Sequence, residues 1–339
     1  MQKQNLRHDT IFLIPSSYGG GAEKIFKIIE QNYNAKFLKM WDVNGGLIKS
    51  EIPENIIRRL FESFICAYRL RKVVLLEPHI RHLILFLPLG LLATILCPKK
   101  LNRIYCRRND YPKKSLNRRI EKYCEWMING YVFCSKQTAL TTKKPFVIVR
   151  NPIPKVSQIS EIAARNFSND AMIVGRLSKQ KRPLFAAQIG YGRSWRNFTF
   201  YGDGPLRADL ESFAAGCKNL IIEGYVPDPF GFNESGILLH CSSYEGSPNV
   251  IYEAVAVGRI VVCQAGLSGI EDLPSEILQS HFCFVDNDRS EDIATWQSAL
   301  DQAEQKLKSI KKSGVVDRHM ETDEQYVERF TNNLMSLVN

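Results

Sequence analysis

The sequence lacks the marks of several common protein classes. Its nine cysteines include no C-x-x-C pair and no close Cys/His grouping, which argues against a disulfide framework and a zinc site and favours a reducing cytosol. Residues 1–9 are polar, and no cleavage site follows an apolar core there, so we expect no signal peptide. The longest apolar run, Leu83–Cys97, has 15 residues and contains Pro88 and Gly90. A membrane-spanning helix needs roughly 20 apolar residues. We therefore expect a buried helix in a cytoplasmic protein.

The charge is distributed unevenly along the chain. Residues 1–150 carry 27 basic and 11 acidic side chains, a formal charge of +16, whereas the remainder carries 18 basic and 24 acidic ones. This asymmetry suits a first half that meets anionic lipid or a phosphorylated acceptor, since each nearby Lys or Arg contributes about 1 kcal/mol at an anionic surface. A solvated basic face without a partner is the alternative. Aromatic residues are not interleaved with the basic ones, so we expect no nucleic-acid partner.

Apolar runs of strand length alternate with helical stretches throughout. In the first half the expected strands are Thr10–Pro15, Val73–Leu76, Arg103–Cys106, Tyr131–Cys134 and Phe146–Val149. In the second half they are Ala171–Val174, Asn197–Tyr201, Leu220–Ile222, Gly236–His240, Ile260–Cys263 and Phe282–Val285. Strands and helices in alternation predict an α/β fold whose parallel sheets are covered by helices on both faces.

The length of 339 residues exceeds what one hydrophobic core usually supports, which predicts two domains. Asn151-Pro152-Ile153-Pro154 is the best hinge, because two prolines in four residues exclude a helix or a central strand. We expect Rossmann-like domains over 1–150 and 151–320, facing each other across a cleft that holds ligands at the strand ends. The last segment, 321–339, is expected to form a helix that packs back on the first domain.

The most informative motif begins at Glu245 and ends at Glu253, directly after the expected strand Gly236–His240. Its middle is Gly246-Ser247-Pro248-Asn249-Val250. A glycine and a proline let the backbone approach a ligand, and free N–H groups at a helix start can face a sugar hydroxyl or a phosphate.

This string resembles the E-x7-E signature of glycosyltransferase family 4, whose members are retaining enzymes with two facing Rossmann-like domains, the GT-B fold. The resemblance covers nearly the whole chain. It implies that Glu245 meets the donor sugar and that Glu253 binds the nucleotide ribose. Gly175-Arg176-Leu177-Ser178-Lys179-Gln180-Lys181 is similar to the family's G-R-L-x-x-x-K segment, which implies that Arg176 and Lys181 clamp the donor diphosphate. Fixed cations there stabilise the charge that grows on the leaving group.

Two further turns resemble nucleotide-binding loops of the family. Gly202-Asp203-Gly204-Pro205 resembles the G-x-G-P turn beside the nucleotide, and Gly224-Tyr225-Val226 resembles the loop over the base. In the first domain Tyr18-Gly19-Gly20-Gly21-Ala22-Glu23 resembles the glycine-rich loop between donor and acceptor, with Gly20 and Gly21 at the donor. An oxidoreductase fingerprint is disfavoured, because Lys24 stands where the third glycine of G-x-G-x-x-G would be.

The acceptor side is expected in the first domain. Arg107-Arg108-Asn109-Asp110-Tyr111-Pro112 resembles an R-N-D-x-P form found in a branch that acts in bacterial surface polysaccharide assembly, with Arg108 where many members carry histidine. We include Arg108, Asn109 and Asp110. Glu77 and His79 end an earlier strand and face the expected cleft, although a structural role for His79 is favoured.

Asp286-Asn287-Asp288 matches the D-x-D of a different glycosyltransferase fold. It precedes Ser290-Glu291-Asp292, a helix N-cap pattern, so we interpret its carboxylates as solvated and expect no metal and no other cofactor.

Together these features predict a hexosyltransferase that uses a UDP-sugar and a lipid-linked or oligosaccharide acceptor at the inner face of the cytoplasmic membrane. A GT-B transferase with a donor such as GDP-mannose is one alternative. A non-catalytic basic scaffold at the membrane surface is the other.

Overall fold

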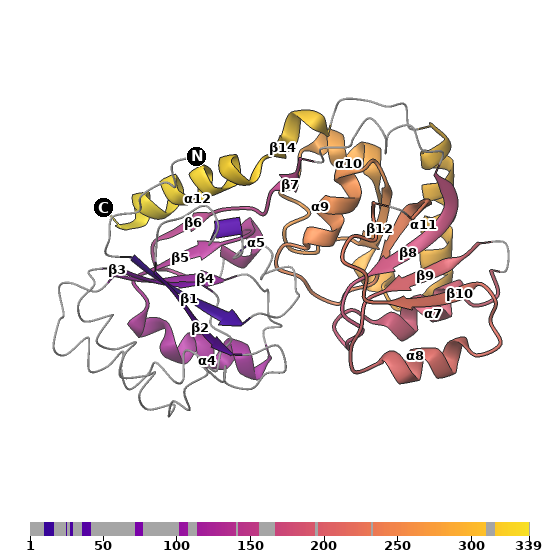
Figure 1. The fold of residues 1–339 in the computed structure, drawn as a ribbon, viewed down its shortest axis with the longest axis horizontal. Helices are drawn as coiled ribbons and strands as arrows, with labels where there is room; N and C mark the ends of the chain where they lie inside the picture. The colour runs from indigo at the N-terminus through magenta and orange to yellow at the C-terminus, as the bar shows by residue number, and fades with distance from the viewer. Residues whose placement is uncertain are drawn as a thin grey trace. The chain divides into compact units, whose positions relative to one another are not determined.

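The structure is a computed structural model that describes residues 10–16, 25, 28–29, 36–41, 72–76, 102–107, 114–139, 142–155, 167–193, 196–231, 233–309 and 316–338. The chain divides into two compact units (Figure 1). One contains residues 1–151 and 323–339, and the other contains residues 152–322.

The first unit contains a six-stranded parallel sheet with the strand order β2-β1-β3-β4-β5-β6. Its strands are β1 (Thr10–Ser16), β2 (Lys36–Trp41), β3 (Lys72–Leu76), β4 (Asn102–Arg107), β5 (Gly130–Phe133) and β6 (Phe146–Ile148). The order reverses between the neighbours β1 and β3, whose carboxyl ends therefore form the topological switch point of this sheet.

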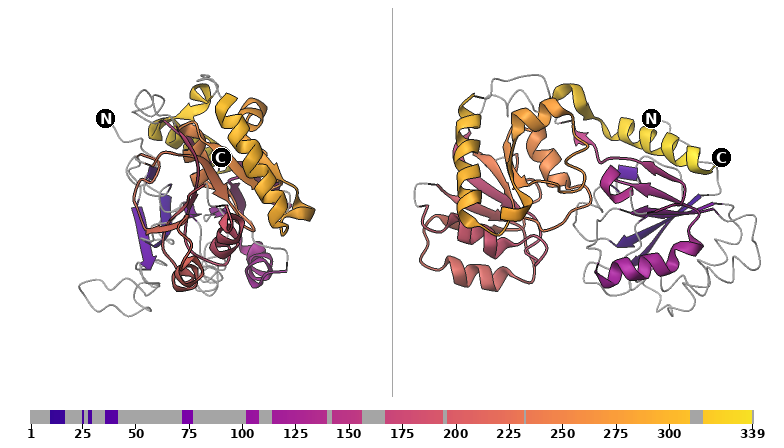
Figure 2. Two further views of the ribbon diagram at one scale, coloured as in Figure 1. Left: turned by 90° about the vertical axis from the view of Figure 1, so that its right-hand side faces the viewer. Right: turned by 180° about the vertical axis from the view of Figure 1, so that it is seen from behind.

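Successive residues of β4 and β5 face opposite sides of this sheet, as the two-residue period of a strand requires. Ile104, Cys106 and Val132 pack with α12 (Asp323–Val338) on one side. On the other side Tyr105, Tyr131 and Phe133 pack with residues from α4 (Leu116–Cys124) and from the chain that follows it. Figure 2 shows the sheet between these two helices. A short helix, α5 (Lys136–Ala139), follows β5.

The second unit contains another six-stranded parallel sheet, with the order β10-β9-β8-β11-β12-β13. Its strands are β8 (Ser168–Val174), β9 (Phe198–Tyr201), β10 (Leu220–Gly224), β11 (Ser235–His240), β12 (Ile260–Gln264) and β13 (Phe282–Val285). This is the order of a Rossmann sheet, with its switch point between β8 and β11.

Helices cover both faces of the second sheet (Figure 1). One core holds residues of α7 (Pro183–Gly190), α8 (Arg207–Ala214) and α11 (Ile293–Ser309), packed on alternate strand residues such as Ile237 and Leu239. The opposite core holds residues of α9 (Asn249–Ala256) and α10 (Ser275–His281), packed on Leu238 and Val261. All six residues of β11 are buried, as expected for a central strand covered on both faces.

The expected linker forms a small structure of its own. β7 (Ile153–Pro154) pairs with β14 (Met320–Glu321), so that the chain enters and leaves the second unit side by side. From there α12 returns to the first unit, where Tyr326, Phe330 and Leu334 are buried. Arg329 Nη2 donates a hydrogen bond to the carbonyl of Arg150 at 3.0 Å.

The expectation of a doubly wound α/β fold with parallel sheets is confirmed, and each expected strand overlaps an observed one. β2 was not expected, because lysines at both 36 and 39 interrupt its apolar run. Lysines suit the edge of a sheet, where β2 lies. Leu83–Cys97 lies outside the described residues. In the part of the chain that is described, no helix is long and apolar enough to cross a membrane.

Candidate active site

The candidate site lies at the switch point of the second sheet. The loop after β8 carries Lys181, and the loop after β11 carries Glu245, although 64 positions separate the two in the sequence. Because β8 and β11 are neighbouring parallel strands, both loops emerge at the same edge. Lys181 Nζ lies 2.5 Å from Glu245 Oε1. His240, the last residue of β11, places its Nε2 3.2 Å from the same oxygen.

The environment keeps Glu245 ionised and His240 neutral. Burial favours the protonated form of Glu245, which is 7% exposed, but Lys181 and His240 together outweigh this effect and hold the pKa of the carboxyl below its usual value. Burial lowers the pKa of His240, and the nearby Lys181 adds to this, against the opposing effect of Glu245. A neutral imidazole facing a carboxylate must donate its Nε2–H, so Nδ1 is the unprotonated nitrogen.

The two loops are also joined through their backbones. The carbonyl of Gln180 accepts hydrogen bonds from Ser243 N at 2.9 Å and from Ser243 Oγ at 3.2 Å. Gln180 Nε2 donates to the carbonyl of Tyr244 at 2.8 Å. These bonds fix the residues next to Lys181 and Glu245, so the ion pair sits on a rigid support.

Glycines bring the loops after β8 and β9 into contact. Gly202 has φ +140°, and a Cβ there would lie 2.0 Å from the carbonyl oxygen of Gly175. A Cβ on Gly204 would lie 2.5 Å from the carbonyl oxygen of Leu177. Leu177 N donates to Asp203 O at 2.9 Å. Only residues without a side chain allow this approach, and the predicted donor-binding Gly202 and Gly204 therefore lie beside the loop that carries Arg176 and Lys181.

The turn after Glu245 leads directly into α9. Gly246 and Pro248 are buried, and Pro248 is the N-cap, whose side chain cannot accept a hydrogen bond. The backbone N–H groups at Asn249 and Val250 therefore receive no side-chain cap from it. Tyr252 Oη donates to the carbonyl of Gly269 at 2.8 Å and lies 3.0 Å from Ser247 Oγ. Since the tyrosine hydrogen is used, Ser247 is the donor in the second bond.

The other predicted residues of the second unit lie on the same edge or on α9. Arg176 is exposed and forms no ion pair within the described part of the chain. Glu253 is partly buried on α9. Tyr225 is exposed just after β10, whereas Val226 packs against the core beneath α9.

The predicted residues of the first unit lie outside the described residues. They are Gly20, Gly21, Glu77, His79, Arg108, Asn109 and Asp110. The strands that precede the first four, β1 and β3, pair with each other at the switch point of the first sheet.

Three residues that contribute to the site were not predicted from the sequence. His240 contacts Glu245, Gln180 holds the loop that carries Lys181, and Tyr252 holds the turn at Ser247. A histidine at the last position of a central strand was a usable signal, because strand ends at a switch point face the ligand.

Asp286 and Asp288 are exposed at the end of β13, and Asp292 instead caps α11 by accepting from Ala294 N at 3.1 Å. Across the residues that the structure describes, no three His, Cys, Asp or Glu side chains are grouped as metal ligands.

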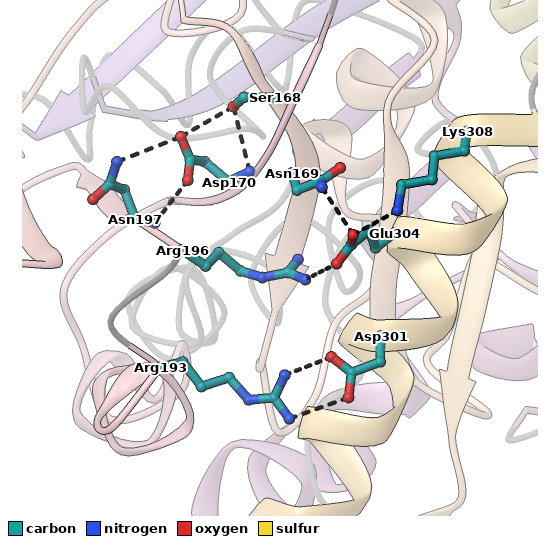
Figure 3. Close-up of polar contacts among 9 residues, drawn as sticks. All are labelled: Ser168, Asn169, Asp170, Arg193, Arg196, Asn197, Asp301, Glu304 and Lys308. Atoms are coloured by element: carbon teal, nitrogen blue, oxygen red, sulfur yellow. Dashed lines mark hydrogen bonds and ion pairs between the residues drawn. The ribbon is translucent and has the colours of Figure 1, made fainter.

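A second polar cluster lies at the opposite end of β8, where the strand begins (Figure 3). Glu304 of α11 accepts from Asn169, Arg196 and Lys308, and Arg193 forms two hydrogen bonds with Asp301. These side chains bind one another and attach α11 to the sheet, so we interpret the cluster as structural.

Comparison with known proteins gives one family match. Residues 168–298 match the family model described as glycosyl transferases group 1. No curated protein sequence is significantly similar to the chain.

Solved structures are similar over most of the chain. HepE of Anabaena in complex with UDP and glucose has a TM-score of 0.71 at 15% identity, covering 97% of this chain and 100% of that one. The lipopolysaccharide outer core galactosyltransferase WaaB, in its apo form, has a TM-score of 0.61 at 15% identity, covering 96% and 99%. The pneumococcal O-GlcNAc transferase GtfA in complex with UDP and GlcNAc has a TM-score of 0.64 at 12% identity, covering 88% and 66%.

The fold is thus GT-B, with two Rossmann-like units. The family match over residues 168–298, which lie in the second unit, supports a glycosyltransferase.

Proposed function

We propose that the protein is a retaining glycosyltransferase of family 4 that transfers a hexose or N-acetylhexosamine from a UDP-sugar. The observation that carries the proposal is the Lys181–Glu245 pair at the switch point between β8 and β11. An ionised carboxylate and a cation meet there beside glycine backbone and the start of a helix, which suits a sugar joined to a diphosphate. The likeness to HepE, whose structure holds UDP and glucose, supports a UDP donor.

In this proposal Arg176 and Lys181 neutralise the diphosphate, and Glu245 binds a hydroxyl of the transferred sugar. An ammonium group has three donors, so Lys181 can hold Glu245 Oε1 and still donate to phosphate oxygens. Glu253 binds the ribose, the backbone at Tyr225 and Val226 holds the base, and the N–H groups at the start of α9 face the diphosphate.

The acceptor hydroxyl attacks the anomeric carbon from the face that the diphosphate leaves. The bond from that carbon to the phosphate oxygen breaks, its electron pair departs with UDP, and the acceptor proton passes to the leaving diphosphate. Arg176 and Lys181 stabilise the charge that grows on UDP, and we propose that no metal is required.

We further propose that the acceptor is a lipid-linked or growing saccharide of a capsule, O-antigen or lipopolysaccharide, met at the inner face of the cytoplasmic membrane. The charge of +16 over residues 1–150 supports an anionic surface or acceptor. The likeness to WaaB, a lipopolysaccharide outer core galactosyltransferase, supports the acceptor class.

A panel of nucleotide sugars tests the proposal. We expect hydrolysis or transfer with UDP-glucose, UDP-galactose or their N-acetyl forms, and loss of about 10²-fold in turnover in Arg176→Ala, which removes one charge partner of the leaving group. The panel includes GDP-mannose, whose use would identify the other donor class. Binding of no nucleotide sugar would favour a non-catalytic scaffold.

A further inference from the structure

The outward side of α4 and of the turn after it exposes three large apolar side chains. Leu116 is 69% exposed, Tyr123 is 73% exposed and Trp126 is 50% exposed. Leu116 and Tyr123 are seven residues apart on α4 and so lie on one side of it, and Trp126 follows in the turn Glu125–Met127. Cys124 and Ile128 are buried against the sheet.

The same segment carries exposed cations, and its two carboxylates bind other residues. Lys114, Arg119 and Lys122 are exposed. Glu121 is buried, with its Oε2 3.1 Å from Arg118 Nη1 and 3.6 Å from Arg107 Nε. Glu125 Oε1 accepts a hydrogen bond from Thr142 Oγ1 at 2.6 Å. The outward side is therefore apolar and positive.

We propose that this side of α4 lies on the surface of an anionic bilayer. Leucine, tyrosine and tryptophan side chains can enter the boundary between headgroups and acyl chains, while lysine and arginine contact lipid phosphates. The inward side of α4 is already packed on the first sheet, so the helix can bind without refolding. The proposal deepens the membrane-facing role given under the proposed function, and its test does not depend on catalysis.

Sedimentation with phosphatidylcholine vesicles, with and without phosphatidylglycerol, tests this surface. We expect binding to the anionic vesicles, at least about tenfold weaker in the variant Leu116→Ser/Tyr123→Ser/Trp126→Ser and in Arg119→Glu/Lys122→Glu. The controls, Tyr191→Ser and Lys218→Glu, change exposed residues of the second unit and should bind like the wild type.

Tryptophan emission gives a second measurement. Vesicles should shift the emission of the wild type to the blue, and Trp126→Phe should remove that shift. Unchanged binding of both α4 variants would overturn the proposal, as would equal binding of the wild type to neutral vesicles. Nucleotide-sugar hydrolysis measured without vesicles should be the same in all variants as in the wild type. If the wild type itself showed no hydrolysis, that result would count against the proposed function and not against the membrane surface.

A different observation concerns the two oxygens of Glu245. Oε1 receives both Lys181 Nζ and His240 Nε2. Oε2 has no hydrogen-bond partner among the described residues. Lys181 stands on a long flexible side chain, whereas His240 is 3% exposed and held at the end of a buried strand. The imidazole is therefore the more rigid of the two contacts.

We infer that His240 is a positioning residue that holds Glu245 Oε1 and so directs Oε2 to a hydroxyl of the transferred sugar. This inference rests on the proposed function. A contact made only with the sugar is absent from UDP, which separates the two ligands experimentally.

Steady-state kinetics, together with calorimetry on UDP and on the intact donor, tests His240→Leu and His240→Gln. The second variant is included because a glutamine amide can replace the Nε2–H donor. We expect His240→Leu to lower kcat/KM about tenfold, the size of one hydrogen bond to a charged group, while the affinity for UDP changes less than about twofold. His240→Gln should recover most of the loss.

If His240 acts through Glu245, the effect of His240→Leu should disappear when Glu245 is changed. In the background of Glu245→Gln, His240→Leu should have little further effect. Equal loss of UDP and donor affinity in His240→Leu, or equal behaviour of the Leu and Gln variants, would overturn the inference while leaving the proposed function standing. A wild type that binds UDP but no UDP-sugar would overturn both.

Discussion

Lys181 Nζ lies 2.5 Å from Glu245 Oε1, and this ion pair joins the loops after β8 and β11 at the switch point of the second sheet. Removing one partner of a buried pair leaves the other charge without compensation. Lys181 therefore has two roles in the proposal: it keeps Glu245 ionised, and it neutralises charge on the donor diphosphate.

Lys181→Ala should lower turnover by about 10²-fold or more, because a fixed cation beside the leaving group is lost. The pKa of Glu245 should rise in this variant, since burial then acts with less opposition. The pH profile of kcat/KM should accordingly lose activity at the acid side at a higher pH than the wild type. Lys179→Ala, which changes an exposed lysine of the same loop, is the control. Full activity in Lys181→Ala would remove the diphosphate clamp from the mechanism.

Gly202→Ala should disrupt the junction of the loops after β8 and β9, because its Cβ would lie 2.0 Å from the carbonyl oxygen of Gly175. Gly192→Ala is a matched control, since Gly192 also has a positive φ, +80°, but no heavy atom lies within 4 Å of its added Cβ. We expect the control to cost about 1 kcal/mol of unfolding free energy from backbone strain alone. Gly202→Ala should cost more and also weaken UDP binding. Equal costs, measured by urea unfolding, would contradict this account.

The folded protein should become less stable as the pH is lowered, because His281 is harder to protonate in the folded chain than in the unfolded chain. Burial, with help from Lys306, lowers the pKa of this histidine to about 4. Between the ordinary value of 6.5 and about 4 the unfolded chain takes up a proton that the folded chain refuses. The contribution of His281 is thus complete above pH 6.5 and is lost as the pH falls towards 4.

Urea unfolding at neutral pH and near pH 4.5 measures this effect. His281→Asn should reduce the difference in unfolding free energy between the two pH values by about 3 kcal/mol. His319→Asn, which changes an exposed histidine, is the control for the loss of a histidine side chain. Parallel profiles for His281→Asn and the wild type would contradict this prediction, because they would mean that His281 binds a proton equally well in the folded and the unfolded chain.

Transfer should persist in excess chelator, because the proposed partners of the diphosphate are Arg176 and Lys181. The measurement is the initial rate with EDTA, followed by addition of magnesium or manganese as the control. Should transfer stop and return with the metal, Asp286 and Asp288 would become candidate ligands, and Asp286→Asn/Asp288→Asn should then abolish the return.

Most of the fold could be predicted from local pattern, because central strands such as Ile260–Gln264 are continuous apolar runs. β2 could not, since an edge strand tolerates the lysines that break its run. Leu116, Tyr123 and Trp126 are of residue types usually found in a core. Their exposure could not be predicted, because it depends on which side of α4 packs on the sheet.

The sequence supplied candidate residues for the second unit but not the contacts among them. The motifs assigned Lys181 to the diphosphate and Glu245 to the sugar, yet these side chains meet each other across 64 positions of sequence. His240 ends an apolar run and so has the surroundings of a core histidine. Strand order brings all three together, and strand order is a tertiary property that local periodicity does not contain.

The two glutamates of the motif should fail differently, because they are proposed to meet different parts of the donor. Glu253→Gln should weaken UDP and the intact donor alike, since the ribose is common to both. A uniform loss of binding raises KM more than it lowers kcat. Glu253 is partly buried on α9, and its contact with the ribose is part of the proposed function.

Glu245→Gln should leave UDP affinity nearly unchanged and depress transfer, because its proposed partner hydroxyl exists only on the sugar. A carboxylate also favours the cationic transition state more than a neutral amide does. The substitution removes the charge that Lys181 faces at 2.5 Å, so Lys181 should become more available to phosphate, and UDP should bind equally well or slightly better. Calorimetry with UDP and with the intact donor on both variants decides the matter. If Glu245→Gln lost UDP affinity as severely as Glu253→Gln, the assignment of sugar to one carboxylate and ribose to the other would be wrong.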